Sequence, residues 1–125
     1  LPGQTKEGWA QTVRDRIDDE RVTVELYSPD QGSPMAVPWD TELFRTINSV
    51  VKEAMEDAVV VPGMTVGGTD NRFLRAMGIP AYGFIPCLLS NDERRGFHGN
   101  NEFLTIENLN MGCELMYEIT RRMVV

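Results

Sequence analysis

Residues 67–75 read GGTDNRFLR, and residues 78–86 read GIPAYGFIP. The first run begins as a glycine loop and continues as a short helix, for which Asp70 is the expected N-cap. Gly78 follows as the expected left-handed residue just beyond the end of this helix. From Ile79 to Pro86 the second run is apolar, which is typical of a buried strand. The two runs therefore predict a loop, a helix and a buried strand in succession.

The segments on either side of these runs extend the same pattern. Asp40 is the expected N-cap of a helix with one continuous apolar stripe. That stripe consists of Leu43, Ile47, Val50, Ala54 and Ala58. Residues 58–61 read AVVV, a β-branched run that suits a second buried strand. Thr105 is the expected cap of a final helix. Its predicted apolar face consists of Leu109, Gly112, Cys113, Met116, Thr120 and Met123.

From Asp40 onward the predicted order is helix, strand, helix, strand, helix. This order predicts an α/β fold, here part of a three-layer αβα domain with a mostly parallel sheet. The N-terminal part differs, because a helix capped by Thr5 precedes a strand at residues 22–27 (VTVELY). The expected apolar face of that first helix consists of Trp9, Val13 and Ile17.

The predicted division into parts follows from a proline-rich loop. Residues 28–38 contain three prolines and a glycine, which is typical of a hinge. We therefore predict a partial α+β unit at residues 1–27, a hinge at 28–39 and an α/β segment at 40–125. The sequence lacks an initiator Met, and Leu1-Pro2-Gly3 is expected to be an entry partway into a longer chain, so the localisation stays undetermined.

The bulk composition excludes two classes of partner. The 125 residues are 42% hydrophobic and 25% charged, with a formal net charge of −7. A negative surface repels phosphate, so we expect no nucleic-acid partner. No apolar run approaches the roughly 20 residues of a transmembrane helix, so we expect no membrane span.

Two features could carry chemistry. The loop Gly67-Gly68-Thr69-Asp70 precedes a helix, whose free N–H groups favour an anion, and Thr69 adds a hydroxyl donor. An ordinary loop that only begins a helix explains the same residues. The only histidine, His98, lies in GFHGNNE at residues 96–102, where Glu102 could orient its imidazole toward a metal ion. An exposed histidine without a role is the alternative, and one histidine cannot make a zinc site.

Three elements in this order resemble one protein family. They are residues 67–75, residues 78–86, and the element His98-x-x-Asn101-Glu102 that precedes the final helix. The sequence resembles the C-terminal segment of two-zinc metallopeptidases, namely aminoacylases, succinyl-diaminopimelate desuccinylases and related carboxypeptidases. Residues 1–5 are similar to the entry into the dimerisation (lid) domain of such enzymes. Asn101 departs from the aspartate that is frequent in the family.

The resemblance implies a role for four residues. His98 would be one ligand of the two-metal centre, and Glu102 would orient His98 without binding the metal itself. Gly68 and Thr69 would contact the substrate carboxylate or the scissile carbonyl, so Thr69 and His98 are expected to face one cleft. The other metal ligands and the general base would lie upstream of Leu1.

The resemblance also implies cofactors, partners and an activity for the parent protein. The parent would hold two zinc ions or other divalent metals, cleave amide bonds of peptides or N-acyl amino acids, and form a homodimer through the lid. The 125 residues alone are expected to be inactive and to bind no metal specifically. Two alternatives stay open. One is a non-catalytic binding or interaction domain with the same fold, and the other is an unrelated α/β domain that binds phosphate at the glycine loop.

Overall fold

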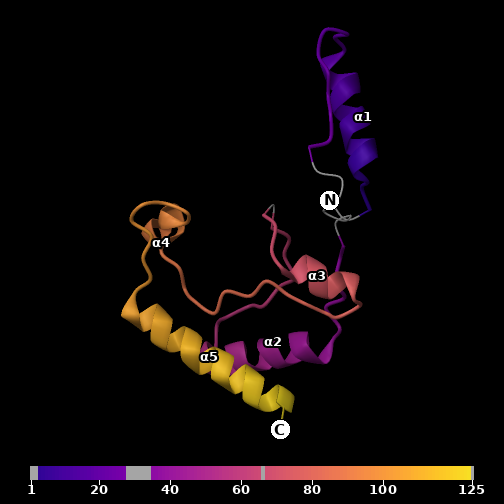
Figure 1. Cartoon of the computed structure of the whole chain (residues 1–125). Helices are drawn as coiled ribbons and strands as arrows, with labels where there is room; N and C mark the ends of the chain where they lie inside the picture. Colours follow the sequence, from indigo (N-terminus) through magenta and orange to yellow (C-terminus); the bar gives the residue numbers. More distant parts are fainter. Residues whose placement is uncertain (1–2, 28–34, 66, 125) are drawn as a thin grey trace. The chain divides into compact units, whose positions relative to one another are not determined.

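The computed structural model describes residues 3–27, 35–65 and 67–124, and these contain five helices (Figure 1). The chain divides into two compact units. Unit 1 consists of Leu1–Pro38 and Gly67–Ala81, and unit 2 consists of Trp39–Val66 and Tyr82–Val125. Residues 28–34 of the predicted hinge lie outside the described residues, so the hinge stays a prediction.

The first helix of unit 1, α1 (Lys6–Ile17), begins as the sequence predicts. The Thr5 hydroxyl accepts a hydrogen bond from the Gly8 N–H at 3.1 Å, which is the N-cap interaction. The predicted apolar face is wrong, however, because Trp9 is 58% exposed and Ile17 is 39% exposed. Ala10 is the buried residue of this helix. The short helix thus has little apolar surface to pack against within its unit.

The segment at residues 22–27 does not form the predicted strand. It follows α1 without regular secondary structure, and the Arg14 guanidinium on α1 donates to the Val24 carbonyl oxygen at 2.8 Å. The hydrogen bond here joins a side chain to the backbone, whereas a strand would form backbone hydrogen bonds with a neighbouring strand.

The second helix of unit 1, α3 (Asn71–Ala76), confirms one prediction and corrects another. Gly78 has φ +78° and donates its N–H to the Arg75 carbonyl oxygen at 2.9 Å, so it is the left-handed residue after the helix. Asp70 precedes the helix, but its side chain makes no capping hydrogen bond. The Arg75 guanidinium donates twice to the Ala81 carbonyl oxygen, at 2.9 and 2.8 Å, and so fixes the chain after the turn.

The core of unit 2 lies between α2 (Glu42–Ala54) and α5 (Ile106–Val124), which pack against each other (Figure 1). The buried residues of this core are Ile47, Val50, Val51, Leu115 and Ile119. Thr41, and not Asp40, is the N-cap of α2, because its hydroxyl accepts from the Phe44 N–H at 3.2 Å. The same hydroxyl lies 2.5 Å from the Tyr82 hydroxyl, so the cap also ties α2 to the segment after residue 81.

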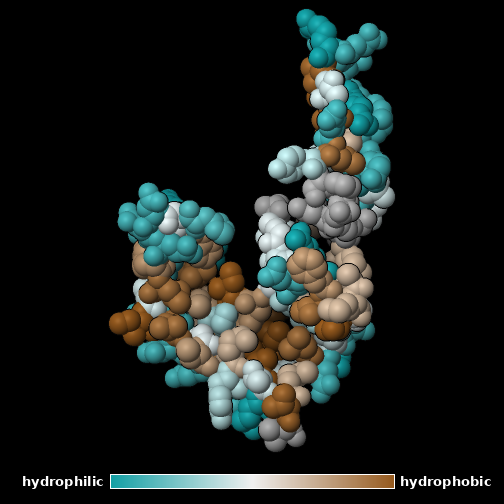
Figure 2. Space-filling model, in the orientation of Figure 1, coloured by the Kyte–Doolittle hydropathy of each residue, from teal (hydrophilic) through white to brown (hydrophobic). Residues whose placement is uncertain are grey.

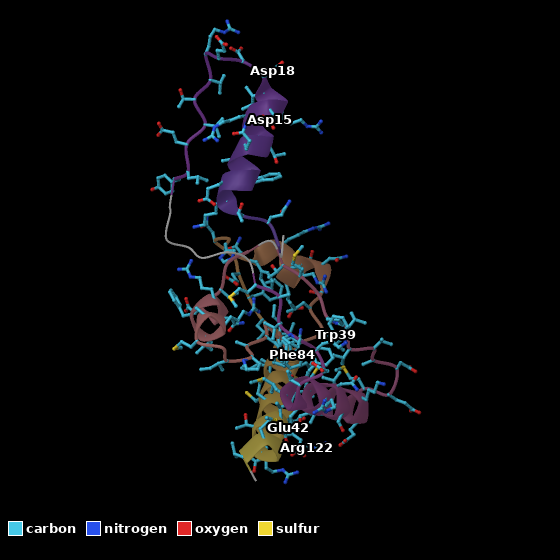
Figure 3. All side chains as sticks on the ribbon, turned by 90° about the vertical axis from the view of Figure 1, so that its right-hand side faces the viewer. Asp15, Asp18, Trp39, Glu42, Phe84 and Arg122 are labelled. Atoms are coloured by element: carbon cyan, nitrogen blue, oxygen red, sulfur yellow. The ribbon has the colours of Figure 1, made fainter. Side chains whose placement is uncertain are left out.

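The buried face of α5 differs from the predicted one by about one position. The buried residues are Asn108, Gly112, Leu115 and Ile119. Leu109 and Met116 of the predicted face are 53% and 45% exposed. Near its C-terminus, Arg122 (labelled in Figure 3) donates to both carboxylate oxygens of Glu53 on α2, at 2.8 and 2.6 Å. The ion pair therefore closes one end of the α2–α5 contact.

No strand is found within residues 3–27, 35–65 and 67–124, so the strands predicted at 58–61 and 79–86 are not formed in the structure. Alternate residues in parts of both segments nevertheless pack against the core of unit 2. The packed residues are Ala58, Val60, Tyr82 and Phe84, and Phe84 is labelled in Figure 3. The intervening Val59 and Ile85 are 80% and 59% exposed. A strand requires a ladder of backbone hydrogen bonds with a neighbour as well as an apolar face, and no strand is formed beside these segments in the described part of the chain.

Candidate functional site

The loop that carries His98 begins with a short capped helix, α4 (Asn91–Gly96). The Ser90 hydroxyl accepts from the Glu93 N–H at 3.2 Å, and the Glu93 carboxylate accepts from the Ser90 N–H at 2.8 Å. This reciprocal pair is a capping box. It fixes the entry of the loop before the chain reaches the histidine.

The Glu93 carboxylate also reaches the far end of the loop. Its Oε1 accepts from the Thr105 N–H at 3.1 Å and from the Asn108 side-chain amide at 2.9 Å. Glu93 is only 1% exposed, and its pKa falls to about 2 because the Asn108 amide, and then the Ser90 and Thr105 N–H groups, donate to the ionised form. One ionised carboxylate therefore joins the entry of the loop to the start of α5.

Asn108 connects this carboxylate to the chain before the loop. Its side-chain oxygen accepts from the Leu88 N–H at 3.0 Å, and its amide donates to the Leu88 carbonyl oxygen at 3.3 Å. Asn108 is 5% exposed and lies on the buried face of α5. We name Ser90, Glu93, Thr105 and Asn108 the loop clamp.

His98 itself lies at the surface in a left-handed conformation, with φ +60°. The turn around it is tight, since the Gly99 N–H donates to the Gly96 carbonyl oxygen at 2.8 Å. A Cβ atom at Gly96 would lie 3.3 Å from the Glu102 Cα, so a larger residue would crowd the returning chain. The loop closes on its own backbone and holds the histidine at an exposed position.

Glu102 lies four residues further on and is also exposed. Within the part of the chain that the structure describes, it makes no side-chain hydrogen bond to His98. Its supporting role toward the imidazole therefore stays a prediction.

The glycine loop before α3 is open on its outer side. Gly68 and Thr69 are exposed, and a Cβ atom at Gly68 would have no heavy atom within 4 Å. The Thr69 carbonyl oxygen accepts from the Arg72 N–H at 3.3 Å, which begins the helix. The loop thus leaves room for a ligand next to Thr69, although an ordinary helix start explains its backbone equally well.

The predicted site residues are divided between the two units of the chain. Gly68 and Thr69 belong to unit 1, whereas His98 and Glu102 belong to unit 2. The expectation that Thr69 and His98 face one cleft therefore stays a prediction. Among residues 3–27, 35–65 and 67–124, no group of three or more His, Cys, Asp or Glu residues could hold a metal ion. The imidazole of His98 is chemically suited to be one metal ligand, and a complete centre would need others.

The loop clamp is a structural feature next to His98 that sequence reasoning missed. Glu93 stands out only as one of several acidic residues near His98, with no spacing of metal ligands. A signal was present, because Ser90 and Glu93 have the S-x-x-E spacing of a capping box. Nothing in the local sequence indicates that the same carboxylate also binds Thr105 and Asn108.

Comparison with known proteins identifies the family. The family model described as peptidase family M20/M25/M40 matches residues 3–122. The chain therefore belongs to peptidase family M20/M25/M40, which confirms the resemblance at the level of the family. No solved structure matches the chain.

Several curated proteins are similar in sequence to this chain. The N-fatty-acyl-amino acid synthase/hydrolase PM20D1.1 of Danio rerio is 28% identical over 84% of this chain and 21% of its own length. The probable carboxypeptidase S-like 2 of Dictyostelium discoideum is 24% identical over 97% of this chain and 23% of its own length. Peptidase T of Bacillus pumilus is 34% identical over 64% of this chain and 18% of its own length. The chain thus spans about a fifth to a quarter of these relatives.

Within the described ranges, no helix has both the length and the apolar character needed to cross a bilayer.

Proposed function

We propose that these 125 residues form the C-terminal part of a metal-dependent hydrolase that cleaves amide bonds of peptides or N-acyl amino acids. The observation that carries this proposal is the family match over residues 3–122. The names of the relatives support the substrate class, since they include an N-fatty-acyl-amino acid synthase/hydrolase, a carboxypeptidase and a peptidase.

In this proposal His98 is one metal ligand. Its exposed position and the closed turn that holds it support this role, because a ligand must reach the metal in a fixed orientation. Gly68 and Thr69 bind the substrate carboxylate or the scissile carbonyl, supported by the open surface next to Gly68. Glu102 orients the imidazole, without binding the metal itself, when the site is assembled.

The parent enzyme would hold two zinc ions, or other divalent metals, with most of the ligands supplied from outside these residues. A bound zinc ion lowers the pKa of water and polarises a carbonyl, which is the chemistry that amide hydrolysis needs. The three-layer α/β architecture and a homodimer formed through the lid domain belong to the same proposal. The 125 residues alone would be inactive, because one imidazole supplies a small part of the coordination energy.

The test uses a full-length polypeptide that contains these residues, with His98→Gln as the variant and Asn100→Ala as the control. Both residues are exposed and lie in the same loop, so neither change disturbs a core. We expect His98→Gln to lower amide hydrolysis more than about 100-fold and to reduce the bound zinc, whereas Asn100→Ala keeps both. Direct zinc analysis and hydrolysis of an N-acyl amino acid are the two measurements.

The alternatives predict other outcomes. A full-length protein that holds no zinc and hydrolyses neither peptides nor N-acyl amino acids would be a non-catalytic binding domain. Binding of inorganic phosphate that depends on Thr69 and not on His98 would support the phosphate-binding alternative. The first outcome contradicts the proposed hydrolase, and the second does so when His98→Gln also leaves amide hydrolysis and bound zinc unchanged.

A further inference from the structure

The buried carboxylate of Glu93 lies between the two ends of the loop that presents His98. It contacts Ser90, where the loop begins, and Thr105, where α5 begins. Among the described residues Glu93 is the only large side chain that is less than 2% exposed. A carboxylate is costly to bury unless hydrogen-bond donors satisfy it. Its burial here therefore indicates that the two ends of the loop need a hydrogen-bond acceptor, which an apolar residue could not provide.

The three donors suit a carboxylate and not its amide analogue. Two N–H donors point at Oε1, from Thr105 and Asn108, and the Ser90 N–H points at Oε2. A glutamine has one acceptor oxygen, so its NH2 group would have to face a backbone N–H. Hydrogen bonds to an ionised acceptor are also stronger than neutral ones. Glu93→Gln therefore breaks the clamp with almost no change in volume.

The clamp acts on His98 through the backbone of the loop. Between the fixed ends, the Gly96–Gly99 hydrogen bond and the close approach of Gly96 to Glu102 leave the chain little freedom. Asn108 then connects the clamp to Leu88 and to the buried face of α5. A series of hydrogen bonds thus runs from the buried face of α5 to both ends of the loop that carries His98.

We propose that Glu93 is a positioning residue, which fixes the loop at residues 90–105 and so presents His98 in the orientation required for metal binding. This inference rests on the proposed function, in which His98 is a metal ligand. Glu93 itself touches neither metal nor substrate. Its role is to reduce the reorganisation that metal binding would otherwise demand of the loop.

The test compares Glu93→Gln with Asp92→Asn, a matched control that removes the same charge from the adjacent residue. The Asp92 side chain is 81% exposed and its nearest cation, on Arg95, is 3.6 Å away, so this control leaves the clamp intact. Amide hydrogen exchange in the 125-residue chain is the first measurement. We expect Glu93→Gln to speed exchange at Ser90, Thr105 and residues 96–102 by more than about tenfold, with helix α2 unchanged. Asp92→Asn should leave all of these rates within about twofold.

Zinc affinity of the full-length polypeptide is the second measurement, with zinc alone as the probe. Loss of a residue that orients a ligand typically weakens metal binding by about 10- to 100-fold, and we expect this for Glu93→Gln. The KM for substrate should stay within about twofold once zinc is saturating, which a general loss of structure would not allow. If Glu93→Gln does not fold, Asn108→Ala removes one of the three donors to the Glu93 carboxylate, together with both side-chain hydrogen bonds to Leu88, and should shift exchange and zinc affinity in the same direction.

The outcomes separate the two proposals. If His98→Gln leaves zinc binding intact, the proposed function fails, whatever Glu93→Gln does to the loop. If His98→Gln abolishes zinc binding while Glu93→Gln changes neither exchange nor zinc affinity, only the positioning role is overturned.

Discussion

Replacement of Leu115 by alanine tests the packing of unit 2 at its centre. Leu115 is 4% exposed on α5 and belongs to the core with Val50 and Ile119. The change removes three carbon groups, each contributing about 0.8 kcal/mol when buried, which amounts to about 2–3 kcal/mol. A cavity adds to such losses, but Leu115 also lines an open groove between α2 and α5, so neighbouring side chains can relax. We therefore expect the free energy of unfolding to fall by about 2–3 kcal/mol, near the lower end of the range for buried leucines.

Leu109→Ala is the matched control, because it makes the same chemical change on the same helix. Leu109 is 53% exposed, so only about half of the same transfer energy is at stake, roughly 1 kcal/mol. Alanine has a higher helix propensity than leucine, which offsets roughly 0.2 kcal/mol of this loss. Urea unfolding of the 125-residue chain, followed by circular dichroism, gives both values. Equal losses, or a larger loss for Leu109→Ala, would show that α5 buries the face originally predicted from the sequence and would refute the described core.

Three further predictions concern the 125-residue chain. The pKa of Glu93 is about 2 in the folded chain, below its ordinary value of 4.5. The carboxylate therefore stabilises the fold fully above pH 4.5, and this stabilisation is lost as the pH falls toward 2. The free energy of unfolding, measured as a function of pH, should show this loss, and the loss should be smaller in Glu93→Gln. The chain should bind zinc no more tightly than an ordinary surface histidine binds it, and it should hydrolyse no substrate. Stoichiometric zinc binding with micromolar affinity, together with turnover, would contradict this. Val59, Val61 and Ile106 are 80%, 68% and 77% exposed, so sizing should detect self-association that rises with concentration, and a monomer at every concentration would be the opposing result.

Local signals in the sequence predicted the start and end of several elements. The cap at Thr5 and the left-handed Gly78 were recognisable because each depends on a few neighbouring residues. The cap of α2 was misplaced by one residue, since Asp40 and Thr41 are both good caps and only the backbone decides between them. Such choices are fixed by geometry that a single sequence does not show.

The face of α5 was misjudged for a different reason. A search for apolar residues passes over Asn108, because an amide on a buried face contradicts the usual pattern. The structure buries Asn108 because Glu93 and Leu88 satisfy its hydrogen bonds. With Asn108 included, the stripe continues through Gly112, Leu115 and Ile119. The same omission hid the part of the loop clamp that Asn108 forms with Glu93.

The predicted strands and the predicted metal ligand are incomplete in the same way. The segment at residues 58–61 has one side packed on the core, whereas Val59 and Val61 on its other side are exposed, although their β-branched side chains are typical of a strand covered on both faces. His98 is held in place by the loop, although one imidazole cannot hold a metal ion. Under the proposed function, a single additional stretch of polypeptide would supply both the neighbouring strands and the remaining ligands. Folding of that stretch against the exposed side would then be coupled to completion of the metal centre, because metal ligands that come from separate segments are fixed only when those segments pack together.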